Sequence, residues 1–281
     1  MLTKNDINAH FERADARPSR ALGQNFVADP NTVRRIVRLA EITADTTVVE
    51  IGAGLGSLTL ALAETGATIT AVEIDRYLIG QLTENVGAHS NVTVVHADAM
   101  QLDWDTLLPV GGGPYVLVAN LPYNVATPLV ADLLDDVPQI DRMLVMVQKE
   151  VGERLAAKPK DDAYGAVSVK VAYYATAAVV GLVPPTVFIP QPKVDSALVR
   201  IDRRPAPIVD PSLVSRERLF AVVKAGFAQR RKMLRGNLAG IVTPEAFALA
   251  GVAPTARAEE IGVEAWGLLA GAPPPLPAAG A

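Results

Sequence analysis

Apolar and polar positions alternate in two distinct ways along the first two-thirds of the chain. Short apolar runs are separated by stretches whose apolar residues recur every three to four positions, as in an amphipathic helix. The runs predict strands over residues 46–51, 68–74, 92–96, 115–119 and 143–147, and the stretches predict helices over residues 57–65, 76–86, 128–135 and 149–157. Asp29 followed by Pro30 predicts the N-cap and first turn of a further helix. Apolar strands alternating with helices predict a parallel sheet covered on both faces.

The pattern changes after residue 163. Strands are expected over residues 166–175, 179–183 and 194–202, where they would complete the sheet in antiparallel orientation. Pro205 and Pro207 mark a linker, and the spacing beyond it is helical, with breaks near Gly240 and Pro254. The chain is therefore expected to form an α/β domain with an N-terminal helical extension over residues 1–205, a helical domain over 206–271 and a disordered tail over 272–281.

Residues 171–192 contain no charged side chain and are long enough to suggest a membrane span. Gly181, Pro184 and Pro185 interrupt them, so two buried strands joined by a Pro-Pro turn are the better interpretation. The charged start of the chain predicts no signal peptide. The absence of cysteine excludes disulfides and thiolate zinc sites, and the three scattered histidines predict no metal site. We expect a soluble, cytoplasmic, monomeric protein without membrane contact.

The charge distribution is uneven. The net charge is −4, yet residues 188–240 hold 11 Lys and Arg against 4 Asp and Glu. A basic segment on an acidic chain is typical of a face that meets a polyanion. The charge count alone is equally compatible with helix faces that are simply solvated.

The stretch EIGAGLGSLTLAL, which begins at Glu50, predicts a strand, a glycine turn and a helix. A dinucleotide-binding fingerprint would need glycine where Ser57 stands. The spacing of Gly52, Gly54 and Gly56 instead resembles the first motif of S-adenosylmethionine-dependent methyltransferases. On its own this motif is weak evidence, because glycine turns also serve chain geometry.

Polar side chains end the next three predicted strands, namely Glu73, Asp98 and Asn120. The carboxyl ends of parallel strands meet in one crevice, so these side chains are expected to converge there. A carboxylate at Glu73 would accept the ribose hydroxyls, and Asp98 would accept the exocyclic amine of an adenine ring. The three positions together favour an S-adenosylmethionine site.

The sequence Asn120-Leu-Pro-Tyr123 resembles the motif of methyltransferases that modify amino nitrogens. An exocyclic adenine amine is a poor nucleophile because its lone pair is delocalised into the ring. If the Asn120 side-chain oxygen and the Leu121 carbonyl accept its two hydrogens, the lone pair can point at the methyl group. Tyr123 offers a ring on which the base can stack, and Phe188 is a candidate for a second ring opposite it. A phenylalanine of the core is an equally good interpretation of Phe188.

Several stretches together identify a family. From about residue 22 to residue 238 the chain resembles the bacterial small-subunit rRNA adenine dimethyltransferases, the KsgA/RsmA family, in stretches that include LGQNFVADPN, VVEIGAGLGSLT, VANLPYNVATPL, MVQKEVGERLAA, FIPQPKVDSALVRI and FAQRRKMLRGNL. This resemblance implies a Rossmann-like class I methyltransferase, with a mostly parallel seven-stranded sheet and a small all-helical C-terminal domain. The implied reaction is dimethylation of N6 on two adjacent adenosines near the 3′ end of 16S rRNA, in the assembling small subunit.

The resemblance also implies roles for individual residues. The cofactor contacts would be Asn25, Val27, Gly52, Glu73, Asp98 and Asn120. The residues at the reacting base would be Asn120, Leu121, Tyr123 and Phe188. Phosphate contacts would come from a helix of the C-terminal domain, through Arg230, Arg231, Lys232 and Arg235. Val27 stands where the family usually has leucine, which is harmless if the contact uses backbone atoms.

Three other functions compete with this interpretation. The macrolide-resistance methyltransferases share the fold and the N6 chemistry but modify large-subunit rRNA. A non-catalytic ribosome assembly factor would keep the fold without needing Asn120 and Tyr123. A methyltransferase with a small-molecule substrate would not need the basic C-terminal segment.

Overall fold

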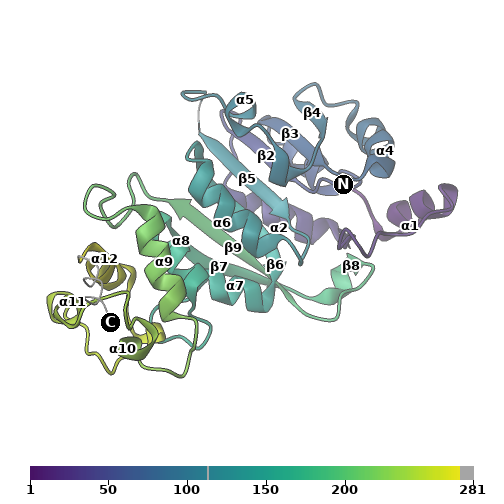
Figure 1. Ribbon diagram of the computed structural model, residues 1–281. Coiled ribbons are helices and arrows are strands. Elements are labelled where there is room, and N and C mark those ends of the chain that lie inside the picture. The colour runs from purple at the N-terminus through teal and green to yellow at the C-terminus, as the bar shows by residue number, and fades with distance from the viewer. Residues whose placement is uncertain (113, 273–281) are drawn as a thin grey trace. The chain divides into compact units, whose positions relative to one another are not determined.

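The computed structural model describes residues 1–112 and 114–272. They divide into two compact units, one made of Met1–Glu153 and Ala177–Arg203, the other of Arg154–Thr176 and the residues from Arg204 onward (Figure 1). The sequence places one boundary near residue 205 but does not indicate that Arg154–Thr176 groups with the helical part. Residues 273–281, nearly all of the predicted disordered tail, lie outside the described residues.

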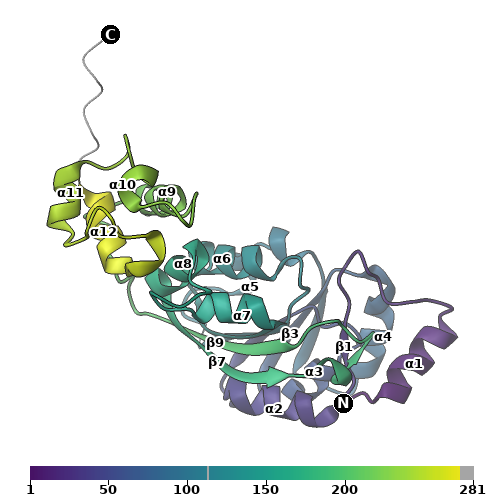
Figure 2. The ribbon, with the colours of Figure 1, turned by 90° about the horizontal axis from the view of Figure 1, so that it is seen from below.

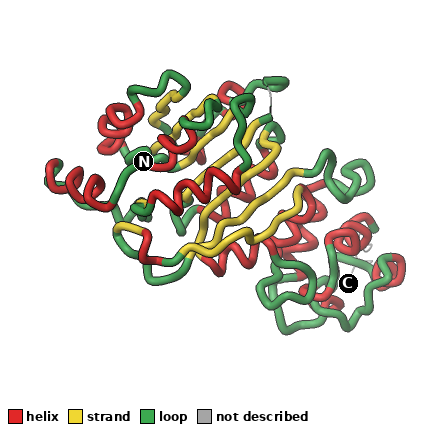
Figure 3. Tube along the Cα trace, turned by 180° about the vertical axis from the view of Figure 1, so that it is seen from behind, coloured by secondary structure: helices red, strands yellow, loops and turns green. Residues whose placement is uncertain are grey.

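The first unit is built on a seven-stranded sheet with the strand order β4-β3-β2-β5-β6-β9-β7. Figure 3 shows the strands in yellow. Strands β2 to β6 pair with one another in parallel, and β9 is antiparallel to β6. The strands are β2 (Thr47–Ile51), β3 (Thr68–Glu73), β4 (Val92–His96), β5 (Tyr115–Asn120), β6 (Ile140–Gln148), β7 (Ala175–Val183) and β9 (Ser196–Arg203). This arrangement confirms the predicted fold class. The strand order reverses between β2 and β5, where a ligand crevice is expected at the carboxyl ends.

Helices cover both faces of this sheet. Figure 2 shows α2 and α3 on one face and α6 and α7 on the other. Val48 of β2 and Val118 of β5 pack in one cluster with Val33 of α2 and Leu62 of α3. The helices of this part of the chain are α1 (Lys4–Arg13), α2 (Pro30–Ala40), α3 (Ser57–Ala63), α4 (Arg76–Val86), α5 (Trp104–Leu107), α6 (Ala126–Asp136) and α7 (Lys149–Ala156), with the short 3-10 turns η1 (Ala99–Gln101) and η2 (Pro185–Val187).

The helix starts follow from local sequence. As predicted, Asp29 caps α2: its carboxylate accepts hydrogen bonds from the backbone of Asn31 and Thr32, and Pro30 occupies the first turn. Asp75 caps α4 in the same way by accepting from the backbone N–H of Tyr77. Strands β1 (Phe26–Val27) and β8 (Phe188–Ile189), each two residues long, form a separate antiparallel ribbon. These short elements place the loop before β1 next to the sheet.

The prediction of a strand over residues 166–175 is wrong. These residues form helix α8 (Ala166–Tyr174), and β7 follows it directly. Val169, Val171, Tyr173 and Tyr174 are all buried, so the helix is apolar nearly all round and shows no helical period. Ser168 stabilises its start, because its hydroxyl accepts from the Gly165 backbone at 3.0 Å and donates to the Arg154 carbonyl at 2.6 Å. The uncharged segment 171–192 is thus shared between a helix end, a largely exposed edge strand and η2 rather than forming two buried strands.

The second unit is helical, as predicted. Besides α8 it contains α9 (Arg216–Gly226), α10 (Leu234–Asn237), α11 (Pro244–Leu249), the 3-10 turn η3 (Ala258–Glu260) and α12 (Val263–Gly271). Trp266 is fully buried at its centre, 5.7 Å from the ring of Phe227. Glycine is required at position 226, because a Cβ there would collide with the Trp266 ring. Within residues 1–112 and 114–272, every helix is too short or too polar to cross a membrane.

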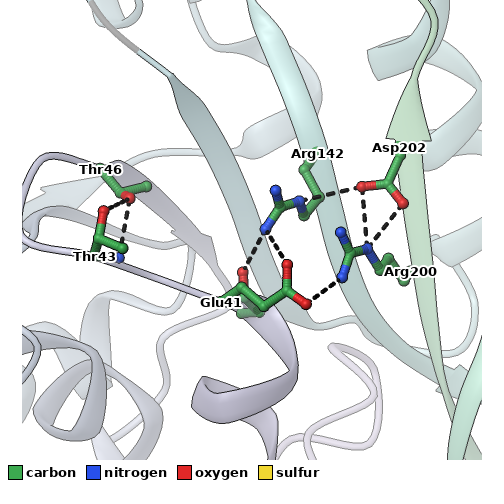
Figure 4. Close-up of polar contacts among 7 residues, drawn as sticks. Glu41, Thr43, Thr46, Arg142, Arg200 and Asp202 are labelled. Atoms are coloured by element: carbon green, nitrogen blue, oxygen red, sulfur yellow. Dashed lines mark hydrogen bonds and ion pairs between the residues drawn. The ribbon is translucent and has the colours of Figure 1, made fainter.

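An ion-pair network ties α2 to the sheet in the first unit (Figure 4). Arg200 lies 2.8 Å from Glu41 and 2.8 Å from Asp202, and Arg142 lies 3.3 Å from Glu41 and 3.2 Å from Asp202. The Arg200 hydrogen bond lowers the pKa of Glu41. Arg142 also donates to the Ala40 carbonyl at 3.0 Å, so the end of α2 is held against β6 and β9.

Candidate active site

A cavity of about 250 Å³ opens at the carboxyl ends of the central strands. Segments far apart in sequence line it: the start of α1, the loop before β1, the glycine turn after β2, and the ends of β3, β4 and β5. The structure brings together every predicted cofactor contact in its wall, that is Asn25, Val27, Gly52, Glu73, Asp98 and Asn120. Leu121 and Tyr123 line the same cavity.

The glycine turn gives the cavity a wall made of backbone. Gly52, Gly54 and Gly56 have φ angles of 73°, 61° and 89°, in the left-handed region that side chains disfavour. A Cβ on Gly54 would also lie 2.9 Å from Cε1 of Phe26, inside van der Waals contact. The turn therefore needs glycine for its conformation, and its lack of side chains lets a ligand approach the main chain.

Glu73 is held in one orientation by that turn. Its side chain is buried, Oε2 accepts from the Gly54 N–H at 2.7 Å, and Oε1 accepts from the Asp75 N–H at 2.9 Å. Burial raises the pKa of Glu73, and these backbone hydrogen bonds oppose the rise. Each carboxylate oxygen has two lone pairs, so both oxygens keep capacity for the hydroxyls of a ligand.

Glu50 is a site residue that the sequence reasoning missed. It is the next-to-last residue of the apolar strand β2, is 1% exposed and lines the cavity. Its Oε2 has no hydrogen-bond partner among the described residues. Burial raises the pKa of Glu50 to about 8. The Thr59 hydroxyl lowers this pKa, and the negative charge of Glu73 raises it further. A charged residue between Val49 and Ile51 was the available signal in the sequence.

Asp98 combines a structural and a ligand-facing position. It caps η1: Oδ1 accepts from the Met100 backbone at 2.9 Å, and Oδ2 accepts from the Gln101 side chain at 3.3 Å. The carboxylate remains partly exposed at the cavity wall. Capping therefore fixes its direction without using all of its acceptor capacity.

The Asn120-Leu-Pro-Tyr123 segment turns the end of β5 into α6. Asn120 Nδ2 donates to the Asn25 carbonyl at 2.8 Å, which leaves Oδ1 as the atom able to accept from a ligand. The Leu121 N–H donates to the Met146 carbonyl at 3.0 Å, and the Pro122 carbonyl accepts from the backbone of Val125 and Ala126. The Leu121 carbonyl accepts no backbone hydrogen bond in the described part of the chain. Two acceptors thus stand available side by side in sequence.

Tyr123 is held from the far side of the site. Its hydroxyl lies 2.9 Å from Oγ of Ser196, a fully buried residue that opposes Gln148 in the β6–β9 ladder. Burial raises the pKa of Tyr123, and the Ser196 hydrogen bond lowers it. The half-buried ring keeps one orientation at the cavity wall.

The structure does not bring Phe188 to this cavity. It opposes Val27 in the β1–β8 ribbon, is 3% exposed, and packs in the core cluster with Val33 and Ile36. Its burial fits the interpretation as a core phenylalanine, and its role as a second ring opposite Tyr123 stays a prediction. Val187 and Ile189 flank it in the sequence, and such an apolar segment suits both a core phenylalanine and a ring that stacks on a base.

The predicted RNA-contacting residues lie in the second unit, and they do not form one helix. The basic run crosses a turn between the end of α9 and the start of α10. Arg231, Lys232 and Arg235 are exposed. Arg230 is exposed as well, and its guanidinium donates to the Asp162 carbonyl at 2.8 Å and lies 3.8 Å from Glu259. All four predicted contacts are thus exposed, and Arg230 also joins neighbouring segments of this unit.

The basic turn is fixed by one side chain. Asn237 Nδ2 donates to the Gly226 carbonyl at 2.6 Å and to the Gln229 carbonyl at 3.1 Å. The backbone of Leu234 and Arg235 donates to the carbonyls of Ala256 and Pro254. The turn that carries Arg231 and Lys232 is therefore anchored at both ends.

The cavity fits a ligand with a cationic amino-acid group, a ribose and an adenine. Glu73 supplies acceptors for hydroxyls and Asp98 an acceptor for an amine. Glu50 supplies a buried carboxyl oxygen, Oε2, that has no partner among the described residues and that a cation would satisfy. The glycine turn supplies space along the backbone. Among the residues that the structure describes, no three His, Cys, Asp or Glu side chains gather as a metal site would require.

The fold and this cavity define a Rossmann-like class I methyltransferase. The chain belongs to the ribosomal RNA adenine dimethylase family, whose model matches residues 16–270. It is 49% identical over 272 residues to the ribosomal RNA small subunit methyltransferase A of Kineococcus radiotolerans, a match that covers 94% of this chain and 88% of that protein. It is 50% identical over 273 residues to the protein of the same name from Thermobifida fusca, covering 94% and 93% of the two chains.

Two solved structures have a similar fold. The 23S rRNA methyltransferase ErmE superposes with a TM-score of 0.68 at 28% identity, covering 87% of this chain and 98% of that one. A dimethyladenosine transferase from Plasmodium falciparum superposes with a TM-score of 0.70 at 21% identity, covering 86% and 94%.

Proposed function

We propose that this protein transfers methyl groups from S-adenosylmethionine to N6 of two adjacent adenosines near the 3′ end of 16S rRNA, in the assembling small ribosomal subunit. The observation that carries the proposal is the pair of acceptors at Asn120 Oδ1 and the Leu121 carbonyl, beside a cavity lined by the carboxyl groups of Glu50, Glu73 and Asp98. The small-subunit target is supported by the relatives at 49% and 50% identity, against 28% for the 23S rRNA enzyme ErmE.

S-adenosylmethionine supplies an electrophilic methyl group on a sulfonium, together with its own leaving group. In the proposed arrangement, Glu73 accepts the ribose hydroxyls and Asp98 the adenine amine. Glu50 would hold the ammonium group of the methionyl end, whose positive charge would favour the ionised form of this carboxyl. Asn25, Val27 and the glycine turn supply the remaining wall of the site.

The protein's contribution to methyl transfer is position. Asn120 Oδ1 and the Leu121 carbonyl accept the two hydrogens of the target amine, and this directs the nitrogen lone pair toward the methyl group. The Tyr123 ring stacks on the base, worth about 1–3 kcal/mol. No strong general base is needed, because the methylated nitrogen loses its extra proton to water. The rate enhancement then comes from orientation and preorganised hydrogen bonds.

The adenine must leave its stack to reach these acceptors. We propose that Arg231, Lys232 and Arg235 bind phosphates and position the RNA, while Arg230 supports the turn from which they project. We further propose that the protein works as a monomer in the cytoplasm, where small subunits assemble.

The test offers labelled S-adenosylmethionine to the protein with unmethylated small subunits and, separately, with naked large-subunit rRNA. Digestion and identification of the labelled nucleosides should give N6,N6-dimethyladenosine from the small subunit alone. Label on the large-subunit RNA would instead indicate a resistance-type enzyme. Binding to the subunit without methyl transfer would leave a non-catalytic assembly factor and contradict the role given to Asn120.

A further inference from the structure

The loop before β1 faces the cavity on one side and solvent on the other. Residues 21–25 line the cavity wall. Arg20 directly precedes them, Arg17 lies three positions before Arg20, and both are exposed. Neither guanidinium makes a hydrogen bond or ion pair among the described residues, so both charges are free to meet a ligand.

This loop is closed on itself. The Gln24 N–H donates to the Ser19 carbonyl at 3.1 Å, the Ser19 N–H donates to the Gln24 side-chain oxygen at 2.7 Å, and the Gly23 N–H donates to the Arg20 carbonyl at 3.1 Å. Arg20 therefore projects from a turn whose backbone is restrained at both ends. A restrained backbone lowers the entropy cost of using the side chain for binding.

The same loop is joined to both halves of the active site. Asn25 accepts the hydrogen bond from Asn120, and the Gln24 side chain donates to Asp75 at 2.7 Å, next to the Glu73 carboxylate. Gly23 packs closely on the turn at residues 120–123. A Cβ on Gly23 would lie 3.2 Å from Cβ of Pro122. The exposed arginines consequently lie within a few residues of groups that contact the cofactor and the target base.

The net charge of residues 13–25 is opposite in sign to that of the first two-thirds of the chain. Between residues 13 and 25 the chain carries Arg13, Arg17 and Arg20, with Asp15 as the acidic residue. Residues 1–187 taken together carry more acidic than basic side chains. A cationic loop at the entrance of a base-binding site matches a polyanionic substrate.

We propose that Arg17 and Arg20 bind phosphates of the substrate RNA beside the target adenosine. This inference rests on the proposed function and extends it, because it places an RNA contact in the catalytic unit, outside the basic segment that charge counting singled out. In this proposal one loop lines the cofactor cavity, accepts the hydrogen bond from Asn120 and binds the RNA backbone.

The test compares the double variant Arg17→Gln/Arg20→Gln with the matched control Arg34→Gln/Arg38→Gln. The control removes the same charge from exposed positions on α2 that do not line the cavity. The KM for unmethylated small subunits and the Kd for a fragment of the 16S 3′ end are measured from 50 to 300 mM salt. S-adenosylmethionine affinity is measured by calorimetry.

We expect the loop variant to raise both RNA constants about tenfold and to reduce the slope of log Kd against log salt by about 1.4–1.8. The control should stay within about twofold of wild type, and cofactor affinity should be unchanged in both. Equal behaviour of loop variant and control would overturn the inference. So would a loss of cofactor affinity that accounts for the whole effect. If wild type itself fails to methylate small subunits, the proposed function fails, and the Kd for the fragment still decides whether the loop binds RNA.

Discussion

The Asn120 side chain donates to the backbone carbonyl of Asn25 across 2.8 Å and 95 positions of sequence. An amide can present either its nitrogen or its oxygen to a ligand, and this bond decides between them. With Nδ2 used on Asn25, the oxygen is left to accept from an amine. The cofactor-side loop thus sets the orientation of the group assigned to the target base.

Replacing Asn120 by alanine removes that acceptor. We expect kcat to fall by about 100-fold or more, because a preorganised hydrogen bond to the reacting amine is lost. The free energy of unfolding should fall by only about 1 kcal/mol, the net value of one hydrogen bond. Single-turnover methylation of small subunits and a thermal melt measure the two effects. Wild-type turnover in a folded variant would show that Asn120 has no part in the chemistry.

Variants of Tyr123 and Ser196 can separate the contribution of the tyrosine ring to activity from that of its hydroxyl. Tyr123→Phe keeps the stacking surface and loses one hydrogen bond, so its kcat/KM should stay within about tenfold of wild type. Tyr123→Ala loses the stacking itself, which predicts a fall of about 5- to 150-fold. Ser196→Ala is the matched control and should behave like Tyr123→Phe. If Tyr123→Phe lowered kcat/KM as much as Tyr123→Ala does, the tyrosine hydroxyl and not ring stacking would account for the role of Tyr123.

Glu50 makes stability depend on pH in a defined direction. Its pKa is about 8 in the folded protein against an ordinary value of 4.5, so between these values the folded state binds more protons than the unfolded chain. The free energy of unfolding therefore falls as pH rises through this window. Glu50→Gln removes the titration and should match wild type near pH 5 but melt at a higher temperature near pH 8. Glu73 also has a raised pKa but is present in both proteins, so it cancels from the difference.

The same variant tests the partner assigned to Glu50. A cation beside the carboxylate should release its proton, so cofactor binding near pH 7 is expected to release protons in wild type and fewer in Glu50→Gln. Calorimetry in buffers of different ionisation enthalpy measures this number. Identical proton release in the two proteins would remove Glu50 from the cofactor site.

The basic turn of the second unit predicts two different outcomes for neighbouring arginines. Arg231→Gln/Arg235→Gln removes two exposed charges and should reduce the slope of log Kd for RNA against log salt by about 1.4–1.8, with little change in melting temperature. Arg230→Gln loses the contacts to Asp162 and Glu259, so it should lower stability by about 1 kcal/mol or less. A salt slope unchanged in the double variant would move the RNA contact away from this turn.

The sheet and most of the site could be predicted because both depend on regular patterns. Parallel strands are buried on two faces and are therefore apolar throughout, and polar residues at their carboxyl ends must converge. This is why Glu73, Asp98 and Asn120 were found from position alone, and all three line the cavity. The glycine turn was found because the φ angles it needs restrict the residue type.

The remaining features depend on tertiary contacts that leave no periodic signal. Helix α8 is buried nearly all round, so its valines and tyrosines look like a strand. Phe188 packs in one buried cluster with Val27 and Val33, a contact between distant segments that its local sequence does not reveal. The hydrogen bond from Arg230 to the Asp162 carbonyl joins residues 68 positions apart, so local sequence does not distinguish Arg230 from the neighbouring basic residues.

The path of the chain between the two units has a practical consequence. The helical unit takes Arg154–Thr176 from between two strands of the sheet, and the rest from Arg204 onward. A chain cut at residue 205 would keep α8 without α9 and α12, and would bare the buried faces of Val169 and Tyr173. The two units cannot be separated by a single break, so exchange of the helical unit between relatives requires two junctions to be matched at once. Truncation is then expected to yield aggregation rather than a soluble methyltransferase fragment.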